Sequence, residues 1–203
     1  MLLEVESSQL VLVDYQIKLM PAMKDAQAVW QRAAVMARTA QLLHVPVWAT
    51  EQNPSGLGET SPEIRQHCKR VLSKMTFSAV EEGLGEWLSP AAPAVPKGNA
   101  RSLPRHLQKP VEPEVGPSVV IAGCEAHICL LQTALDLLED EFDVWVVTDA
   151  CASRSERDRD AAFDRLAGAG AELLTTEMVI FEWLRSAENP DFKEVQSWVK
   201  ALT

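Results

Sequence analysis

The sequence contains no run of hydrophobic residues as long as the roughly 18–20 residues that cross a bilayer. Its first eight residues include two glutamates and no basic cluster, so they do not resemble a secretory signal. From these two absences we expect a cytoplasmic protein without a membrane partner.

Cysteine is scarce, and its spacing matches no metal-binding or disulfide pattern. Cys68, Cys124, Cys129 and Cys151 include no CxxC pair and no Cys/His alternation typical of zinc sites. In a reducing cytosol such thiols stay free. We therefore predict no disulfide framework, no metal and no cofactor.

Basic residues are outnumbered by acidic ones. The chain has 19 Lys and Arg against 29 Asp and Glu, which gives a formal net charge of −10 at pH 7. The phosphates of nucleic acid and of an anionic membrane would be repelled by this excess. We expect a small-molecule substrate and no nucleic-acid partner.

Strand-like and helix-like segments alternate along the 203 residues, as they do in a parallel sheet covered on both faces. The predicted strands cover 9–14, 45–50, 71–74, 118–122, 143–148 and 171–175. The main predicted helices cover 24–43, 78–88, 129–139 and 155–166, with two more near the C-terminus. This order predicts a single-domain, doubly wound α/β/α sandwich with a mostly parallel sheet of five or six strands.

Prolines concentrate in one segment. Residues 89–117 hold seven of the chain's twelve prolines, and such a stretch neither joins a central sheet nor continues a helix. We predict a proline-rich surface insertion within one domain that spans residues 1–203. A lid, an oligomer contact and a plain loop are all compatible with this composition.

In doubly wound sheets, ligands bind at the carboxyl ends of the strands, near the topological switch point. Several polar residues of this chain lie at such strand ends. Asp14 lies at the carboxyl end of the first strand, Lys74 ends the third, and Cys129 begins the helix after the fourth. A helix N-terminus and a nearby lysine favour thiolate, and a carboxylate can accept the thiol proton. Unpaired cysteines are also common as small buried hydrophobes, so the spacing alone leaves both interpretations of Cys129 open.

Five segments, in order, resemble those of the isochorismatase-like cysteine hydrolase family, most closely its isochorismatase domain-containing proteins and bacterial relatives. These segments are 11–16 (VLVDYQ), 50–58 (TEQNPSGLG), 74–79 (KMTFSA), 123–134 (GCEAHICLLQTA) and 149–155 (DACASRS). The resemblance implies a catalytic triad of Cys129, Asp14 and Lys74. It also implies a non-proline cis peptide bond between Cys124 and Glu125, and an oxyanion hole made of the backbone N–H groups of Glu125 and Cys129.

The resemblance further implies substrate contacts from Gln52 and Phe77, and a homo-oligomer, dimeric or larger. Relatives that bind a metal carry a histidine after the second strand, and residues 50–54 (TEQNP) contain none, so no catalytic metal is expected. His127 lies two residues before the candidate nucleophile, but Asp14 already fills the role of base, and we expect His127 to be structural.

These observations predict a cysteine-dependent hydrolase of a small amide or related C–N bond, acting through a thioester. Two alternatives stay open. One is a catalytically weak family member that acts as an oligomeric binding or scaffold protein, and the other is a vinyl-ether hydrolase of the isochorismate type.

Overall fold

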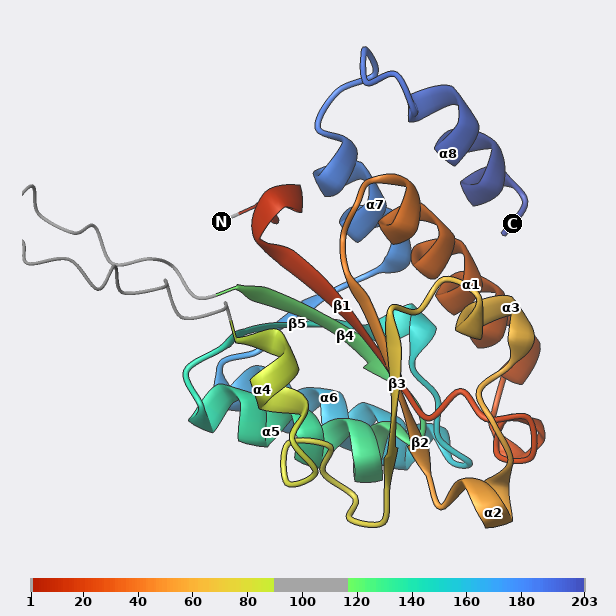
Figure 1. The fold of residues 1–203 in the computed structure, drawn as a ribbon, viewed down its shortest axis with the longest axis vertical. Helices are drawn as coiled ribbons and strands as arrows, with labels where there is room; N and C mark the ends of the chain where they lie inside the picture. Colours follow the sequence, from red (N-terminus) through yellow and green to blue (C-terminus); the bar gives the residue numbers. More distant parts are fainter. Residues whose placement is uncertain (1, 90–116, 203) are drawn as a thin grey trace, which may run out of the picture.

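The computed structural model describes residues 2–89 and 117–202, and within them one sheet of six parallel strands forms the centre of the fold (Figure 1). The strands lie in the order β3-β2-β1-β4-β5-β6, and every neighbouring pair is parallel. Their bounds are β1 Ser8–Val13, β2 Val47–Gln52, β3 Arg70–Lys74, β4 Ser118–Gly123, β5 Asp143–Val147 and β6 Glu172–Leu174. The predicted doubly wound sheet is confirmed.

Helices cover both faces of this sheet, which completes the expected three-layer architecture. On one side lie α1 (Ala26–Leu42), α7 (Thr176–Leu184) and α8 (Phe192–Lys200), and on the other lie α4 (Leu84–Leu88), α5 (Leu131–Glu139) and α6 (Glu156–Ala169) (Figure 1). Two single-turn helices, α2 (Pro54–Leu57) and α3 (Pro62–Arg65), connect β2 to β3. Among the residues described here, no helix has both the length and the apolar character that a bilayer crossing requires.

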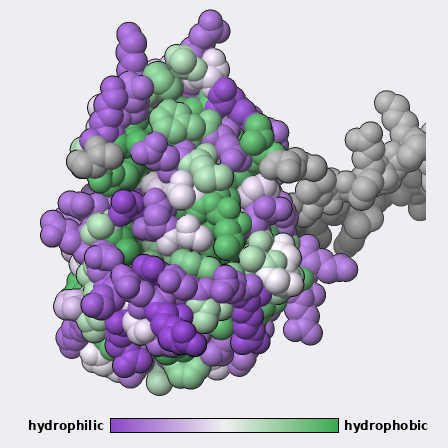
Figure 2. Space-filling model, turned by 180° about the vertical axis from the view of Figure 1, so that it is seen from behind, coloured by the Kyte–Doolittle hydropathy of each residue, from purple (hydrophilic) through white to green (hydrophobic). Residues whose placement is uncertain are grey.

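The two central strands, β1 and β4, are buried because helices pack on both of their faces. Residues 10–13 of β1 and 119–122 of β4 have no exposed surface, as expected for the apolar strands of a parallel sheet. Hydrophilic and hydrophobic residues are interspersed on the surface that Figure 2 shows.

The strand order reverses between β1 and β4, and their carboxyl ends come very close together. A Cβ atom at Gly123 would lie 2.4 Å from the carbonyl oxygen of Val13, so only glycine fits there without a backbone shift. This close approach brings Asp14, after β1, next to Cys124 and the turn that follows β4. The topological switch point therefore lies between β1 and β4.

Two predicted helices have different bounds in the structure. The helix expected over 78–88 is limited to α4, because Gly83 adopts a φ of +93° that a right-handed helix cannot contain. The helix expected to begin at Cys129 instead starts as a π-helical segment, Ala126–Leu130, and continues as α5. The N–H of Leu130 donates to the carbonyl of Glu125, five residues earlier, which defines the wider turn.

The proline-rich insertion predicted at 89–117 lies outside the described residues, apart from Ser89 and Pro117 at its ends. Its role as a lid, an oligomer contact or a loop stays a prediction, as does its place within one domain.

Candidate active site

The candidate site is built at the carboxyl ends of neighbouring strands. Asp14 directly follows β1, Gln52 ends β2 and Lys74 ends β3, while Cys129 lies in the π-helical segment after β4. Since all these strands are parallel, their ends share one edge of the sheet. The structure therefore brings together, from four distant segments, residues that the sequence singled out.

A buried ion pair joins two of them. The Nζ atom of Lys74 lies 2.9 Å from Oδ2 of Asp14, and neither side chain is exposed. The second carboxylate oxygen, Oδ1, accepts a hydrogen bond of 2.6 Å from the hydroxyl of Thr50. Asp14 has a φ of +55°, a left-handed conformation that aspartate tolerates better than most residues.

The Lys74 ammonium is surrounded by further oxygen atoms. It donates to Oε1 of Gln52 at 2.7 Å, to the carbonyl of Phe77 at 3.0 Å and, at 3.4 Å, to the carbonyl of Thr76. A lysine ammonium has three protons to donate, so these three acceptors use all of them, and the contact with Asp14 is an ion pair. The ammonium is fixed in one position.

Cys129 lies beside this group, with its Sγ atom 3.8 Å from Oε1 of Gln52. The expectation that this thiol favours thiolate is wrong for the free protein. Burial raises the pKa of Cys129 to about 12, the charge of Asp14 raises it as well, and Lys74 opposes both. The helical segment also begins at Ala126, three residues earlier, so Cys129 is not at its first position.

The turn between β4 and the π-helical segment contains the non-proline cis peptide bond between Cys124 and Glu125 that the resemblance implied. Within residues 2–89 and 117–202, the N–H of Glu125 donates to no partner. Its role, with the N–H of Cys129, as an oxyanion hole stays a prediction.

Side chains of this turn are tied to residues 152–154, after β5. The Glu125 carboxylate accepts hydrogen bonds from the N–H of Arg154 at 3.2 Å and from its Nε at 2.9 Å. His127 Nδ1 lies 2.9 Å from the hydroxyl of Ser153, and the N–H of Ala126 donates to the carbonyl of Ala152. His127 thus has a structural contact that accounts for its position.

A small cavity of about 120 Å³ opens next to the thiol. It is lined by Leu19, Gln52, Leu57, Phe77, Glu125, Ile128 and Cys129. A larger hollow of about 420 Å³ lies beside α1, around Trp30, but its lining contains no nucleophile and no lysine. Chemistry therefore favours the smaller cavity.

Gln52 and Phe77 both line this cavity, as the resemblance implied, but they differ in availability. Both ends of the Gln52 amide contact protein, since Oε1 accepts from Lys74 and Nε2 donates to the carbonyl of Met75 at 2.8 Å. Phe77 is 52% exposed and forms part of the wall. Their binding of substrate stays a prediction.

Two residues that support the site were missed by the sequence analysis. Gln16 is fully buried, and its side chain bonds both the N–H (2.9 Å) and the carbonyl (3.0 Å) of Gln52. Glu82 accepts from the N–H groups of Met75 (3.2 Å) and Thr76 (3.5 Å), and these hydrogen bonds lower the pKa of Glu82. Neither residue lies on a strand end, and only the folded chain brings them to Gln52 and to the Lys74 loop.

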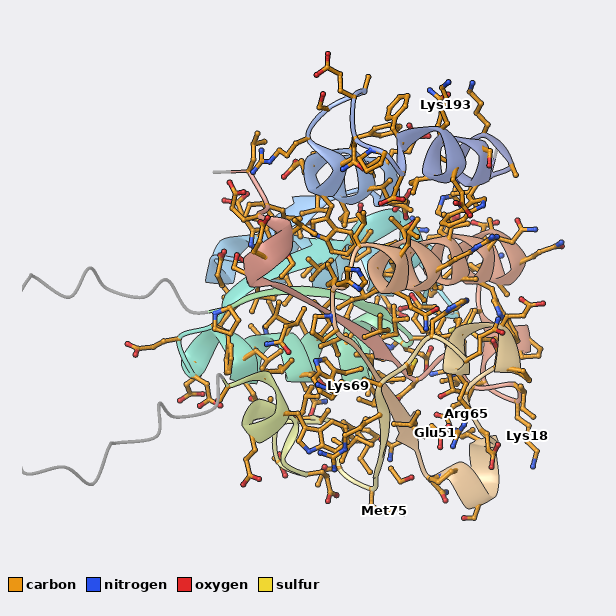
Figure 3. The ribbon with its side chains drawn as sticks, turned by 45° about the horizontal axis from the view of Figure 1, so that its top comes forward. Lys18, Glu51, Arg65, Lys69, Met75 and Lys193 are labelled. Carbon is orange, nitrogen blue, oxygen red and sulfur yellow. The ribbon has the colours of Figure 1, made fainter. Side chains whose placement is uncertain are left out.

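Glu51, a carboxylate one residue before the end of β2, serves a different purpose. Its Oε1 atom accepts from Nη1 of Arg65 at 2.7 Å and from the N–H of Thr60 at 2.6 Å. Figure 3 shows Glu51 and Arg65 side by side near α2 and α3. In the described part of the chain, no three His, Cys, Asp or Glu side chains are grouped so as to hold a metal ion.

Comparisons with known proteins find similar sequences over most of the chain. Residues 107–178 match the model of the isochorismatase domain. The chain is 40% identical to the mouse isochorismatase domain-containing protein 2A over 196 residues, which cover 96% of this chain and 84% of that protein.

Two solved structures have the same fold. One, described as the MAR1 ribonuclease of Caenorhabditis elegans, is 30% identical, with a TM-score of 0.77 and coverage of 98% of this chain and 93% of that one. The other is the YcaC gene product of Escherichia coli, described as an octameric hydrolase of unknown specificity. It is 21% identical, with a TM-score of 0.74 and coverage of 100% and 98%.

Proposed function

Because the chain belongs to the isochorismatase family, we propose that it is a hydrolase that uses Cys129 to cleave a small amide or related C–N bond through a thioester. The observation that carries this proposal is the buried Asp14–Lys74 ion pair beside the Cys129 thiol. A sulfur, a carboxylate and an ammonium are the three groups that such a reaction needs.

In the first half-reaction, Cys129 attacks the carbonyl carbon while its thiol proton passes to Asp14. The thiol of the free protein stays protonated near neutral pH, because its pKa is about 12, so the proton leaves as the S–C bond forms. The Lys74 ammonium stabilises the negative charge on sulfur and carboxylate. The C–N bond then breaks, and Asp14 returns the proton to the leaving ammonia or amine.

The tetrahedral intermediate of each half-reaction carries an oxyanion, for which we assign the N–H groups of Glu125 and Cys129. Loss of one such donor typically lowers the rate by about two to three powers of ten. In the second half-reaction a water molecule gives its proton to Asp14 and attacks the thioester carbon. The carboxylic acid leaves, and the proton returns to the Cys129 sulfur.

A homo-oligomer, dimeric or larger, is part of the proposal, and the description of the Escherichia coli YcaC gene product as octameric supports it. Cytoplasmic location is likewise proposed.

The ribonuclease described from Caenorhabditis elegans raises RNA as a possible class of substrate. A net charge of −10 and a cavity of about 120 Å³ favour a small-molecule substrate for this chain instead.

The test is ammonia release from a panel of small amides and ureas, with wild type, Cys129→Ala and Cys68→Ala compared. Cys68 is a half-buried thiol that bonds the carbonyl of Ile64, away from the cavity, and serves as the matched control. We expect turnover of at least one compound, a drop in kcat/KM of about 1000-fold or more in Cys129→Ala only, and an acyl adduct on Cys129 by mass spectrometry.

Other outcomes would select the alternatives. Activity that survives in Cys129→Ala would exclude the thioester mechanism. If the surviving activity is on vinyl ethers, it would favour the vinyl-ether hydrolase. An oligomer with no turnover and no acyl adduct would favour the scaffold protein.

A further inference from the structure

We infer that the substrate's acyl group is short, apolar and uncharged, and that the site rejects carboxylate-bearing molecules. This inference rests on the proposed function, since it describes the group that Cys129 attacks. It names the substrate class that the cavity selects.

The size of the cavity limits the acyl group. A volume of about 120 Å³ is slightly below that of an apolar protein cavity that holds benzene, so roughly four or five non-hydrogen atoms fit. A nucleotide or a fused ring system is too large for it.

The lining determines polarity. Leu19, Leu57, Phe77 and Ile128 supply apolar walls, and all but the exposed Phe77 are half-buried. Apolar walls cannot hydrate an ion, and transfer of a charged group from water to such surroundings is unfavourable without a partner.

The charges near the cavity are unfavourable for an anion. Among the described residues that line the cavity, Glu125, which is 8% exposed, is the one with a formal charge, and the charge of Asp14 acts on the Cys129 thiol. A second carboxylate in this space would be repelled by Glu125, although the pairing of Glu125 with Arg154 weakens this repulsion.

The nearby cations are already engaged. The Lys74 ammonium contacts Asp14, Gln52 and Phe77, and the guanidinium of Arg154 pairs with Glu125 at 2.9 Å. Lys18 donates to the carbonyl of Gly56 at 3.3 Å and lies at the outer edge of the fold in Figure 3. In the described residues, the cavity lining therefore offers no cation to a carboxylate.

The first experiment measures alkylation of Cys129 by iodoacetamide and by iodoacetate, which differ in charge and little in size. In both, the sulfur forms a bond to carbon and iodide leaves with the electron pair. Each rate is divided by the rate of the same reagent with 2-mercaptoethanol at the same pH, which removes the difference in intrinsic reactivity between the two reagents. The thiolate fraction of Cys129 is common to both reagents and cancels from their ratio. The Cys129 peptide is quantified by mass spectrometry.

We expect the normalised rate with iodoacetamide to exceed that with iodoacetate by tenfold or more. Equal normalised rates, or faster reaction with iodoacetate, would overturn the inference. Leu57→Lys, which adds a cation to the wall, should reduce the ratio at least threefold, whereas the neutral control Leu57→Gln should keep it. A ratio unchanged by Leu57→Lys would contradict the electrostatic explanation.

The second experiment compares kcat/KM for propionamide, butyramide and hexanamide, and for the singly charged succinamate. We expect butyramide to be favoured over succinamate by about 100-fold or more, with activity falling at hexanamide. Cleavage of succinamate as fast as of butyramide would overturn the inference and leave the proposed reaction intact. Selective alkylation without cleavage of any amide would overturn the proposed reaction and leave the inference about the cavity intact. The two failures are therefore distinguishable.

Discussion

The ammonium of Lys74 and the carboxylate of Asp14 meet 2.9 Å apart, although the strands that carry them, β3 and β1, are not neighbours. β2 lies between them, and its last residue, Gln52, accepts a hydrogen bond from the same ammonium. Removing two charges from water is costly, and the attraction between them often fails to offset that cost. We therefore interpret this pair as serving chemistry more than stability.

Removal of one partner should expose that cost. In Lys74→Met the Asp14 carboxylate stays buried without its cation, and we expect the free energy of unfolding to fall by about 3–5 kcal/mol in urea titrations. The double variant Asp14→Asn/Lys74→Met removes both charges and should recover most of this loss, since asparagine also tolerates the left-handed backbone at position 14.

The double variant should regain stability but remain inactive, because it still lacks both the base and the cation. The control is Asp160→Asn, which breaks the 2.9 Å pair with Arg159 at a site where Asp160 is 61% exposed. We expect that change to cost no more than about 1 kcal/mol. A loss of less than about 1 kcal/mol in Lys74→Met would contradict our view of the buried pair.

Gln52 should affect the chemical step, because both ends of its amide already contact protein groups. We expect Gln52→Leu to lower kcat by about tenfold or more by releasing Lys74, with a smaller change in KM. Gln16→Leu, which removes the side chain that holds the Gln52 backbone, should give the same pattern more weakly. If Gln52→Leu raises KM and leaves kcat unchanged, Gln52 binds substrate directly, as the resemblance implied.

The fold was predictable because its determinants are local. Short apolar runs marked all six strands to within two residues of their bounds, and the alternation with helices indicated the parallel topology. Asp14 and Lys74 could be found for the same reason, since each directly follows or ends a strand.

The rest of the site depends on contacts between distant segments, which spacing does not reveal. Gln16 reaches Gln52, and Glu82 reaches the Met75 and Thr76 amides, only after the strands have paired. Spacing left burial and thiolate both open for Cys129, and only the folded chain shows that burial outweighs the effects that lower the pKa of this thiol.

Glu82 should act on catalysis through the loop that surrounds Lys74. Its exposed carboxylate bonds the amides of Met75 and Thr76, and the carbonyl of Thr76 contacts the Lys74 ammonium. We expect Glu82→Ala to lower kcat/KM by roughly tenfold, and Glu82→Gln, which keeps an acceptor oxygen, to lower it less. Thermal unfolding should change little, because the site is on the surface.

The neighbouring exposed residue provides the control, since Glu81→Ala should leave kcat/KM within about twofold of wild type. The pKa of Glu82 is lowered from 4.5 in the folded chain, so its contribution is complete above that value and declines as the pH falls through the lowered pKa. The advantage of wild type over Glu82→Ala should therefore shrink in acid. An advantage that is the same at acid and neutral pH would argue against a charged Glu82 in this role.

Buried thiols should make the protein sensitive to alkali. Burial raises the pKa of Cys129 and Cys151 from 9.0 to about 12, and that of Cys124 well above 9.0. Above pH 9 the unfolded chain loses these protons while the folded chain keeps them, so the free energy of unfolding falls as pH rises. The loss at pH 10 should be about 1.4 kcal/mol for each buried thiol.

Urea unfolding at pH 8, 9 and 10 measures this dependence below the range in which tyrosine ionisation dominates. Cys151→Ala loses the hydrogen bond to the Val147 carbonyl and some packing, so its stability should be lower throughout. The informative quantity is the slope, which should be shallower than in wild type because one titrating thiol is gone. Parallel curves for the two proteins, or a flat curve for wild type between pH 8 and 10, would mean that these thiols ionise as easily in the folded chain as in the unfolded one.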